Sequence, residues 1–242
     1  MTALSLTGAL WMGNAPLIRN LALDMPAARW SCLLGVSGVG KSTIARLIAG
    51  LPGPYRLDGA LTAADGQPLT GRVAMMAQEG QLLPWADLVA NVTIGARLRG
   101  ARPDFARARA MLAEVGLAGL ETRRPAALSG GPCQRVAHAR VLMEDAPVVV
   151  LDEPFSALDT MTRIAMQDLA ARLLRARTVI LITHDPLEAI RLSDRAWHLG
   201  PDGADPLDLP DTDTPRDFRA PAVLAAQSAL LERLQGDLEC AG

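Results

Sequence analysis

The stretch Gly35-Val36-Ser37-Gly38-Val39-Gly40-Lys41-Ser42-Thr43 decides the fold of this chain. It matches the pattern G-x-x-x-x-G-K-[ST], follows an apolar run at 30–34 and precedes a helical pattern at 44–50. A strand, a glycine-rich loop and a helix in this order form a phosphate-binding P-loop. The glycines let successive N–H groups turn toward a polyphosphate, and the helix adds its positive dipole end. We therefore predict that this stretch binds the phosphates of a nucleotide.

Composition singles out one residue of this loop. The chain has 24 basic residues, and Lys41 is the only lysine among them. A compact ammonium fits inside a ring of backbone groups, whereas a wide planar guanidinium fits there poorly. We predict that Lys41 reaches the β- and γ-phosphates and that the hydroxyl of Ser42 ligates Mg²⁺.

The bulk properties of the chain exclude several classes of protein. A net charge of −2 and a pI of about 5.9 give no electrostatic footprint for nucleic acid. The cysteines, Cys32, Cys133 and Cys240, are odd in number and widely spaced, which favours a reducing compartment over a disulfide or zinc framework. No basic region precedes Arg19, and no uncharged run is long enough for a membrane helix. Any work at a membrane is expected to proceed through a partner.

Apolar runs that alternate with helical patterns predict an α/β fold with a parallel sheet. The runs at 148–151 and 178–183 are typical of strands buried on both faces. The segments 4–7 and 17–23 are expected to pair as antiparallel edge strands, and 195–199 is expected to be an edge strand of the main sheet.

The remaining patterns set the domain organisation. We expect one domain over 1–242, with an inserted helical subdomain at 85–138 and a C-terminal loop and helix at 200–242. The clearest helix of the insertion begins at Asp104, an N-cap residue, and ends before Gly116. In the C-terminal helix an apolar face is expected from Val223, Leu230, Leu231 and Leu234.

Polar side chains follow the predicted strands where each strand ends. Asp152 and Glu153 come after the apolar run at 148–151, at the edge of the sheet where the P-loop opens. We predict that Asp152 holds Mg²⁺ and that Glu153 acts as general base on the attacking water. His184 ends another apolar strand and is either a hydrogen-bonded structural residue or a contact to the γ-phosphate. Gln78 is placed to sense Mg²⁺ or water.

Trp11 lies on the approach to the predicted nucleotide site. An exposed aromatic side chain there would stack on adenine. The alternative is an edge-strand tryptophan that fills the core.

A second glycine turn, Leu128-Ser129-Gly130-Gly131, precedes another helix and predicts a second anion site. One nucleotide does not need two such sites in one chain. Two chains packed head-to-tail would use both, each chain completing the site of the other.

Together these motifs resemble the ATP-binding subunit of an ABC transporter. The Walker A loop is at 35–43, the Q-loop is at Gln78, and the signature is at 128–131; the Walker B run ends at Asp152-Glu153, the D-loop is Ser156-Ala157-Leu158-Asp159, and the H-loop residue is His184. The resemblance implies a RecA-like P-loop NTPase fold and a head-to-tail homodimer around two ATP molecules. In that dimer Ser129, Gly130 and Gly131 of one chain would cap the γ-phosphate held by Lys41 of the other. Glu153 and His184 would then drive hydrolysis.

Within the family, Gln78, the segment 82–85 (Leu-Leu-Pro-Trp) and Asn91-Val92 resemble importers of nitrate, sulfonates, taurine and the hydroxymethylpyrimidine precursor of thiamine. The segment 29–35 and the short C-terminal tail most resemble the pyrimidine-precursor group. This branch implies a place on the cytoplasmic face of the inner membrane, permease subunits docked near Gln78–Trp85, and a periplasmic solute-binding protein as an indirect partner. For the apolar segment 82–85, local core packing is the alternative to docking.

Two positions depart from the family pattern, because Pro132 stands where Gln is usual and Cys133 where Arg is usual. Proline in a first helical turn costs little, but a side chain toward the ribose is lost. Two other functions therefore stay open. One is a non-transport ABC ATPase, although the spacing from Thr43 to Ser129 leaves no room for the coiled coil of the repair proteins. The other is a nucleotide-binding regulatory subunit without turnover.

Overall fold

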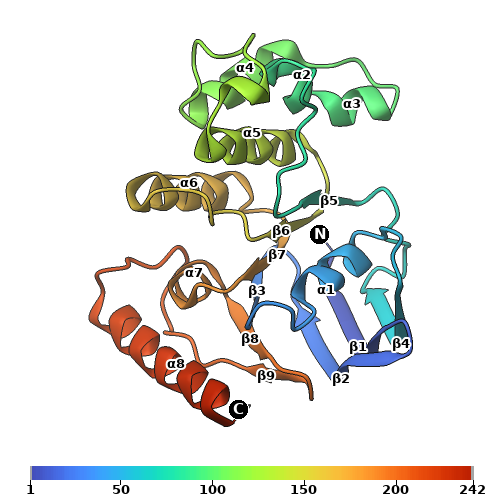
Figure 1. Ribbon diagram of the computed structural model, residues 1–242, viewed down its shortest axis with the longest axis vertical. Coiled ribbons are helices and arrows are strands. Elements are labelled where there is room, and N and C mark those ends of the chain that lie inside the picture. The colour runs from blue at the N-terminus through green and yellow to red at the C-terminus, as the bar shows by residue number, and fades with distance from the viewer. Residues whose placement is uncertain (1, 241–242) are drawn as a thin grey trace.

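The computed structural model describes residues 2–240, with the side chains of 235–240 outside the description (Figure 1). The strands are β1 (Leu4–Met12), β2 (Ala15–Met25), β3 (Trp30–Leu34), β4 (Tyr55–Ala63), β5 (Val73–Met76), β6 (Val148–Asp152), β7 (Thr178–Thr183), β8 (Arg195–Leu199) and β9 (Ala204–Pro206). The helices are α1 (Lys41–Ile48), α2 (Leu88–Val92), α3 (Ile94–Leu98), α4 (Phe105–Glu114), the 3₁₀ helix η1 (Pro125–Ala127), α5 (Gly130–Met143), α6 (Thr160–Leu173), α7 (Pro186–Leu192) and α8 (Pro221–Cys240). Met1 and residues 241–242, which the predicted bounds 1–242 and 200–242 include, lie outside the described residues.

The main sheet has six strands in the order β5-β6-β7-β3-β8-β9, and all its pairs are parallel except β8–β9. The predicted α/β fold and its parallel core are therefore confirmed. In this order β3, which leads into the P-loop, lies beside β7, and β7 lies beside β6. The carboxyl ends of these strands share one edge of the sheet.

Side chains of the central strands alternate between two cores. Cys32, Leu34 and Val149 point into a core shared with α5, α6, α7 and the helical insertion. Leu33 and Val150 point the other way, into a core shared with α1 and the antiparallel strands. Because both faces of the sheet are covered, its central strands β3, β6 and β7 are buried at every position rather than at alternate ones.

The second sheet is antiparallel and has the order β2-β1-β4. The expected pairing of the first two segments is confirmed, with Leu6 opposite Leu23. The strand β4 was not predicted. It places β1 in the centre of this sheet, so Trp11 lies on a central strand and not on an edge strand.

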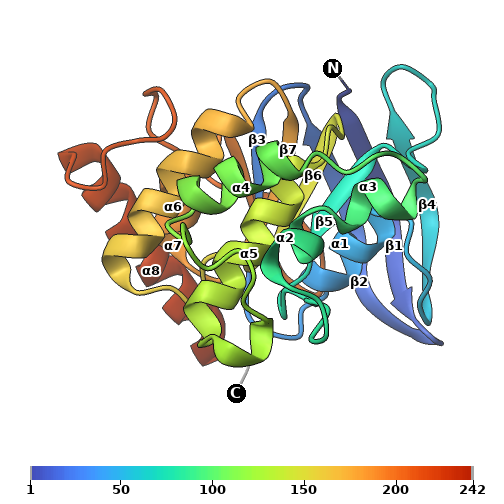
Figure 2. The ribbon, with the colours of Figure 1, turned by 90° about the horizontal axis from the view of Figure 1, so that it is seen from above.

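The helices α2 to α5 follow one another between β5 and β6 and form a layer above the main sheet (Figures 1 and 2). The predicted N-cap is confirmed, because the Asp104 carboxylate accepts a hydrogen bond from the Arg107 amide at 2.9 Å. Ala108 and Leu112 of α4 are buried on one face, as their spacing predicts.

Two predictions for the C-terminal part are wrong. The strand β8 is not an edge strand, because β9 pairs with its outer side. Leu231 does not share the buried face of α8, since its side chain is 42% exposed whereas Val223 and Leu230 are buried. Adjacent helical residues point about 100° apart, so Leu230 and Leu231 cannot both face the core. Within the described residues, no helix is long and apolar enough to cross a membrane.

Candidate functional site

The carboxyl edge of the main sheet gathers most of the predicted site. The register places Leu34 opposite Thr183 and Asp152 opposite Ile182. The P-loop, the acidic pair and His184 therefore leave three adjacent strands at the same level. Sequence positions more than a hundred residues apart are brought together there.

The P-loop wraps around the ammonium group of Lys41. Lys41 Nζ donates hydrogen bonds to the carbonyl oxygens of Gly35 at 2.7 Å and Val36 at 2.8 Å. Burial lowers the pKa of Lys41, while Glu153 and Asp152 nearby oppose that shift. Gly40 has φ +112° at the N-cap of α1, and a Cβ there would lie 2.8 Å from the Leu17 side chain. The backbone angle therefore requires glycine at this position, and a Cβ would also displace the Leu17 side chain.

Asp152 is a buried carboxylate with one free oxygen. Its side chain accepts a hydrogen bond from Ser42, and no group in the described part of the chain bonds to its Oδ1 atom. Burial is the main cause that raises the pKa of Asp152. A hydroxyl and an unsatisfied carboxylate oxygen beside a phosphate-binding loop are the hard oxygen donors that Mg²⁺ prefers. The residues present fit this ion.

Glu153 and His184 form a direct pair. His184 Nδ1 lies 2.6 Å from Glu153 Oε2, with the Glu153 side chain buried and the His184 side chain more than half exposed. Glu153 also has φ +49°, in the left-handed region that glutamate seldom occupies. A strained backbone angle at a carboxylate beside a phosphate loop is typical of a functional site.

A second acidic side chain, Glu188, lies behind this pair. The Thr183 hydroxyl donates to Glu188 Oε2 at 2.7 Å and accepts from the Asp185 amide at 3.0 Å. Burial is the main cause that raises the pKa of Glu188 to about 7. This network fixes the backbone on both sides of His184, and no pattern in the sequence predicted it.

The remaining residues predicted near the nucleotide lie at the rim. Gln78 is exposed, two residues beyond the end of β5 at the same edge of the sheet. Trp11 is half-buried, and the guanidinium carbon of Arg56 lies 4.8 Å from the centroid of its ring. Arg56 thus covers one face of the indole, and stacking of adenine on Trp11 stays a prediction.

The signature turn is not part of this cluster. Ser129 is the N-cap of α5, with Gly130 and Gly131 in its first turn, and α5 lies in the upper layer of Figure 1 while α1 lies below. Pro132 follows in the same turn without interrupting the helix, as expected for that place. Asp159 of the D-loop caps α6 by accepting from the Thr162 amide at 3.1 Å.

One further buried residue, which no sequence motif predicted, touches the site. Gln134 of α5 donates to the carbonyl oxygen of Glu153 at 3.1 Å and accepts from the Ala157 amide at 2.9 Å. A polar residue among the buried apolar positions of α5 was the only signal for it.

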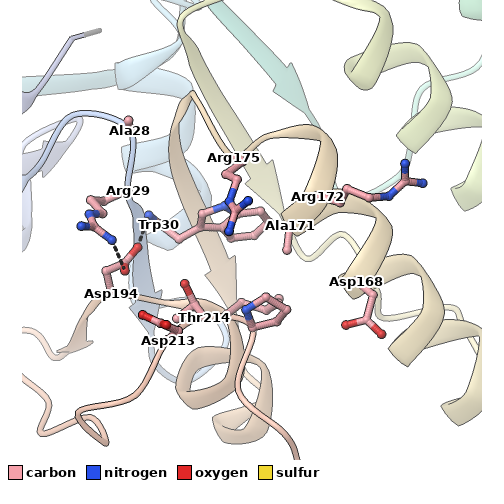
Figure 3. Close-up of a pocket in the computed structure, with 12 residues that line it drawn as sticks. Ala28, Arg29, Trp30, Asp168, Ala171, Arg172, Arg175, Asp194, Asp213 and Thr214 are labelled. Carbon is pink, nitrogen blue, oxygen red and sulfur yellow. Dashed lines mark hydrogen bonds and ion pairs between the residues drawn. The ribbon is translucent and has the colours of Figure 1, made fainter.

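Two larger cavities lie away from the site. One, of about 450 Å³, lies near the amino ends of β3 and β8, where Arg29 pairs with Asp194 beside Trp30 (Figure 3). The other, of about 540 Å³, is a groove between β5, α3 and α5, with Gln81, Leu98 and Arg140 among its lining residues.

Comparisons with known proteins agree with this geometry. The family model described as ABC transporter matches residues 18–156. The aliphatic sulfonates import ATP-binding protein SsuB of Rhodopseudomonas palustris (strain ATCC BAA-98 / CGA009) is 45% identical over 226 residues, which are 92% of this chain and 79% of that protein. The SsuB of Rhodopseudomonas palustris (strain BisA53) is 46% identical over 186 residues, which are 76% of this chain and 65% of that protein.

An uncharacterized ABC transporter ATP-binding protein of Haemophilus influenzae is 39% identical over 236 residues, which are 95% of this chain and 97% of that protein. Among solved structures, a dimeric post-hydrolysis state of the ATP-binding cassette MJ0796 bound to ADP and Pi superposes with a TM-score of 0.72. It is 26% identical in sequence, and the match covers 90% of this chain and all of the other.

Proposed function

Because the chain belongs to the ABC transporter family, whose ATP-binding proteins hydrolyse ATP, we propose that it energises an importer of a sulfonate- or nitrate-type solute. The chain is an ATPase, and the observation that carries its chemistry is the contact between His184 and Glu153 at the edge shared with the P-loop. Glu153 takes the proton of the attacking water, and His184 orients the Glu153 carboxylate beside the γ-phosphate.

The P-loop positions ATP for this step. Lys41 leaves the carbonyl groups of Gly35 and Val36 to meet the β- and γ-phosphates, while the backbone amides of 35–43 line the polyphosphate. Ser42 and Asp152 would hold Mg²⁺, with Gln78 beside it, and the ion would neutralise phosphate charge. The free Oδ1 atom of Asp152 supports this assignment. Trp11 would receive adenine on the face that Arg56 leaves open.

A second copy of the chain would complete each site. The signature residues Ser129, Gly130 and Gly131 begin a helix away from their own P-loop, so they are free to meet the nucleotide of a partner. The solved structure of MJ0796 is a dimer, which supports a head-to-tail pair here. The helical segment 85–138 would then move as one unit within the 1–242 domain, and the 200–242 segment would remain with the main sheet.

The groove beside Gln78–Trp85 fits a permease. Trp85 is 70% exposed and Leu98 is 80% exposed, although both are large and apolar. The loop is nevertheless held firmly, because Asn91 hydrogen-bonds with Leu83 at 2.7 and 3.1 Å and Arg140 donates to the Gln81 carbonyl at 2.9 Å. Of this segment, Leu82 packs on the core, whereas Trp85 is left for a partner. The chain would thus bind at the cytoplasmic face of the inner membrane, and a periplasmic solute-binding protein would act on the far side.

The solute class is drawn from the relatives. The two SsuB proteins named above are aliphatic sulfonates import ATP-binding proteins, and this favours a sulfonate over the hydroxymethylpyrimidine precursor, for which they offer no support. These relatives favour neither a non-transport ATPase nor a regulatory subunit without turnover.

The test is reconstitution of the chain with its membrane partner in vesicles. We expect ATP-dependent uptake of an alkanesulfonate and phosphate release that uptake stimulates. Hydrolysis without uptake of any offered sulfonate, nitrate or pyrimidine would favour a non-transport ATPase. Binding of ATP without phosphate release would favour the regulatory subunit.

A further inference from the structure

We infer that Gln134 of α5, the helix that begins at the signature turn, is a positioning residue for the Glu153 carboxylate. Its side chain is 6% exposed and lies between the backbone of Glu153 and the D-loop. The inference rests on the proposed role of Glu153 as general base. It adds a residue from the helical segment to the hydrolytic site of the same chain.

The backbone at Glu153 needs such support. A non-glycine residue at φ +49° is strained and persists only where its surroundings hold it there. The Glu153 amide donates to the Ile182 carbonyl at 2.9 Å, which fixes one side of the residue. Its carbonyl oxygen, on the other side, accepts from Gln134 Nε2 and from Ser156 Oγ, each at 3.1 Å. Gln134 is the only one of these partners that comes from the helical segment.

Gln134 uses both ends of its amide. Nε2 donates to the Glu153 carbonyl and contacts Ser156 Oγ at 3.3 Å, while Oε1 accepts from the Ala157 amide at 2.9 Å. Only glutamine and the shorter asparagine carry a donor and an acceptor in one side-chain amide group. A buried amide with both ends satisfied fixes the distance between the two segments that it joins.

The first turn of α5 lies beside the D-loop. A Cβ at Gly131 would lie 3.4 Å from the Ala157 carbonyl oxygen, so the first turn of α5 runs close to the D-loop backbone. Gln134 lies one turn further along α5, which also packs on α6 (Figure 1). A displacement of the first turn of α5 is therefore passed to the Glu153 backbone through one side chain.

The test compares Gln134→Met with Gln167→Met in the full chain. Gln167 is also buried in a helix and accepts from Arg191 at 2.8 Å, so its substitution removes a buried amide outside the nucleotide site. We expect Gln134→Met to lower kcat for phosphate release about tenfold or more, because small displacements of a catalytic group cost up to about a hundredfold. KM for ATP should stay within about twofold, because the P-loop is untouched. Gln167→Met should lower Tm and leave kcat unchanged.

Two further variants separate positioning from folding. Gln134→Glu keeps the acceptor for the Ala157 amide but places a carboxylate oxygen next to the Glu153 carbonyl oxygen, where the donor was. It should therefore lower kcat, and it serves as the test if Gln134→Met does not fold. In the Glu153→Gln background, Gln134→Met should not lower the residual rate further, because the two residues act as one unit.

Three results would overturn the inference. They are an unchanged kcat in Gln134→Glu, equal loss of kcat in Gln134→Met and Gln167→Met, and multiplicative losses in the double variant. Wild-type turnover in Glu153→Gln would instead refute the proposed chemistry itself. Loss of turnover in Glu153→Gln together with normal kcat in the Gln134 variants would refute the positioning role of Gln134 and leave the proposed role of Glu153 intact.

Discussion

His184 Nδ1 lies 2.6 Å from Glu153 Oε2. The two residues end adjacent parallel strands, so the sheet itself sets their separation. A carboxylate of Glu153 accepts this bond from Nδ1–H, and in the proposed site the other ring nitrogen of His184 would then face the nucleotide. In the proposed mechanism this pair would link the attacking water to the γ-phosphate.

We expect Glu153→Gln to lower phosphate release by about 10²- to 10⁴-fold, because the base is lost while the shape is kept. ATP binding should survive, because Lys41 and the P-loop are unchanged. The variant should therefore form a long-lived ATP-bound dimer, seen by gel filtration with ATP and Mg²⁺. Glu114→Gln, on the surface of α4, serves as the control and should hydrolyse ATP normally. Elution of the Glu153→Gln variant as monomer alone would count against the dimer.

Lys41→Arg should weaken ATP binding at least about tenfold, which corresponds to about 1.4 kcal/mol. The charge is kept, but once the side chain leaves the Gly35 and Val36 carbonyls, which the ammonium contacts at 2.7 and 2.8 Å, a wide planar guanidinium fits poorly inside the ring of backbone groups that binds the phosphates. Calorimetric titration with ATP measures the change. Arg46→Lys on the exposed side of α1 is the matched control, and its affinity should not change. Equal affinity of Lys41→Arg and wild type would contradict the argument from the single lysine.

Gly40→Ala should destabilise the chain by about 1–3 kcal/mol and also weaken ATP binding. The alanine would have to adopt φ +112°, and its Cβ would lie 2.8 Å from the Leu17 side chain. Gly66→Ala is the matched control, because Gly66 also has a positive φ of +67° but has open space around its Cβ position. Gly66→Ala should lower the free energy of unfolding by about 1 kcal/mol and leave nucleotide affinity unchanged. Thermal unfolding with and without ATP distinguishes the two variants.

Glu188→Gln should stabilise the chain above pH 7 and have little effect near pH 4.5. Burial raises the pKa of Glu188 from 4.5 to about 7, and Asp185 and Glu153 add to that shift while Thr183 and Arg163 oppose it. The folded state thus binds this proton more tightly than the unfolded state, and stability is lost as pH rises through this window. The full effect is at most about 3 kcal/mol. Denaturant unfolding of both proteins from pH 5 to 8 should show a growing difference, whereas a constant difference would contradict this assignment.

Trp85→Ser should leave Tm and basal phosphate release unchanged, because the side chain is 70% exposed. In vesicles with the permease, the same variant should lose uptake and stimulation of hydrolysis. Leu51→Ser, at another exposed apolar position, is the control and should transport normally. Normal transport by Trp85→Ser would place the permease elsewhere.

The sequence predicted those parts of the fold in which local pattern and burial agree. The run 148–151 is apolar throughout because helices and strands cover both faces of its sheet. The strand β4 escaped prediction because most of its residues are exposed and Gly59 interrupts its pattern. That glycine is required by a close approach to Gly8, where a Cβ on Gly59 would lie 2.0 Å from the Thr7 carbonyl. Such a requirement arises only when two strands meet.

The site residues divide in the same way. Lys41, Asp152 and Glu153 were found because their motifs are continuous in sequence and lie at strand ends. Gln134 was missed because its partners, Glu153 and Ala157, lie some twenty residues further along the chain. A buried amide between two segments has no signature in either segment alone.

The burial of Lys41 has a practical consequence for the chemical cross-linking of two copies of the chain. Apart from the α-amino group, this is the only primary amine that the polypeptide carries, and it is 6% exposed and already hydrogen-bonded. Cross-linkers that react with amines, such as succinimide esters and aldehydes, would consequently have almost no accessible amine to react with. Chemical trapping of an assembly must instead use carboxylate coupling or photoreactive groups, and a negative result with amine reagents would carry no information about association.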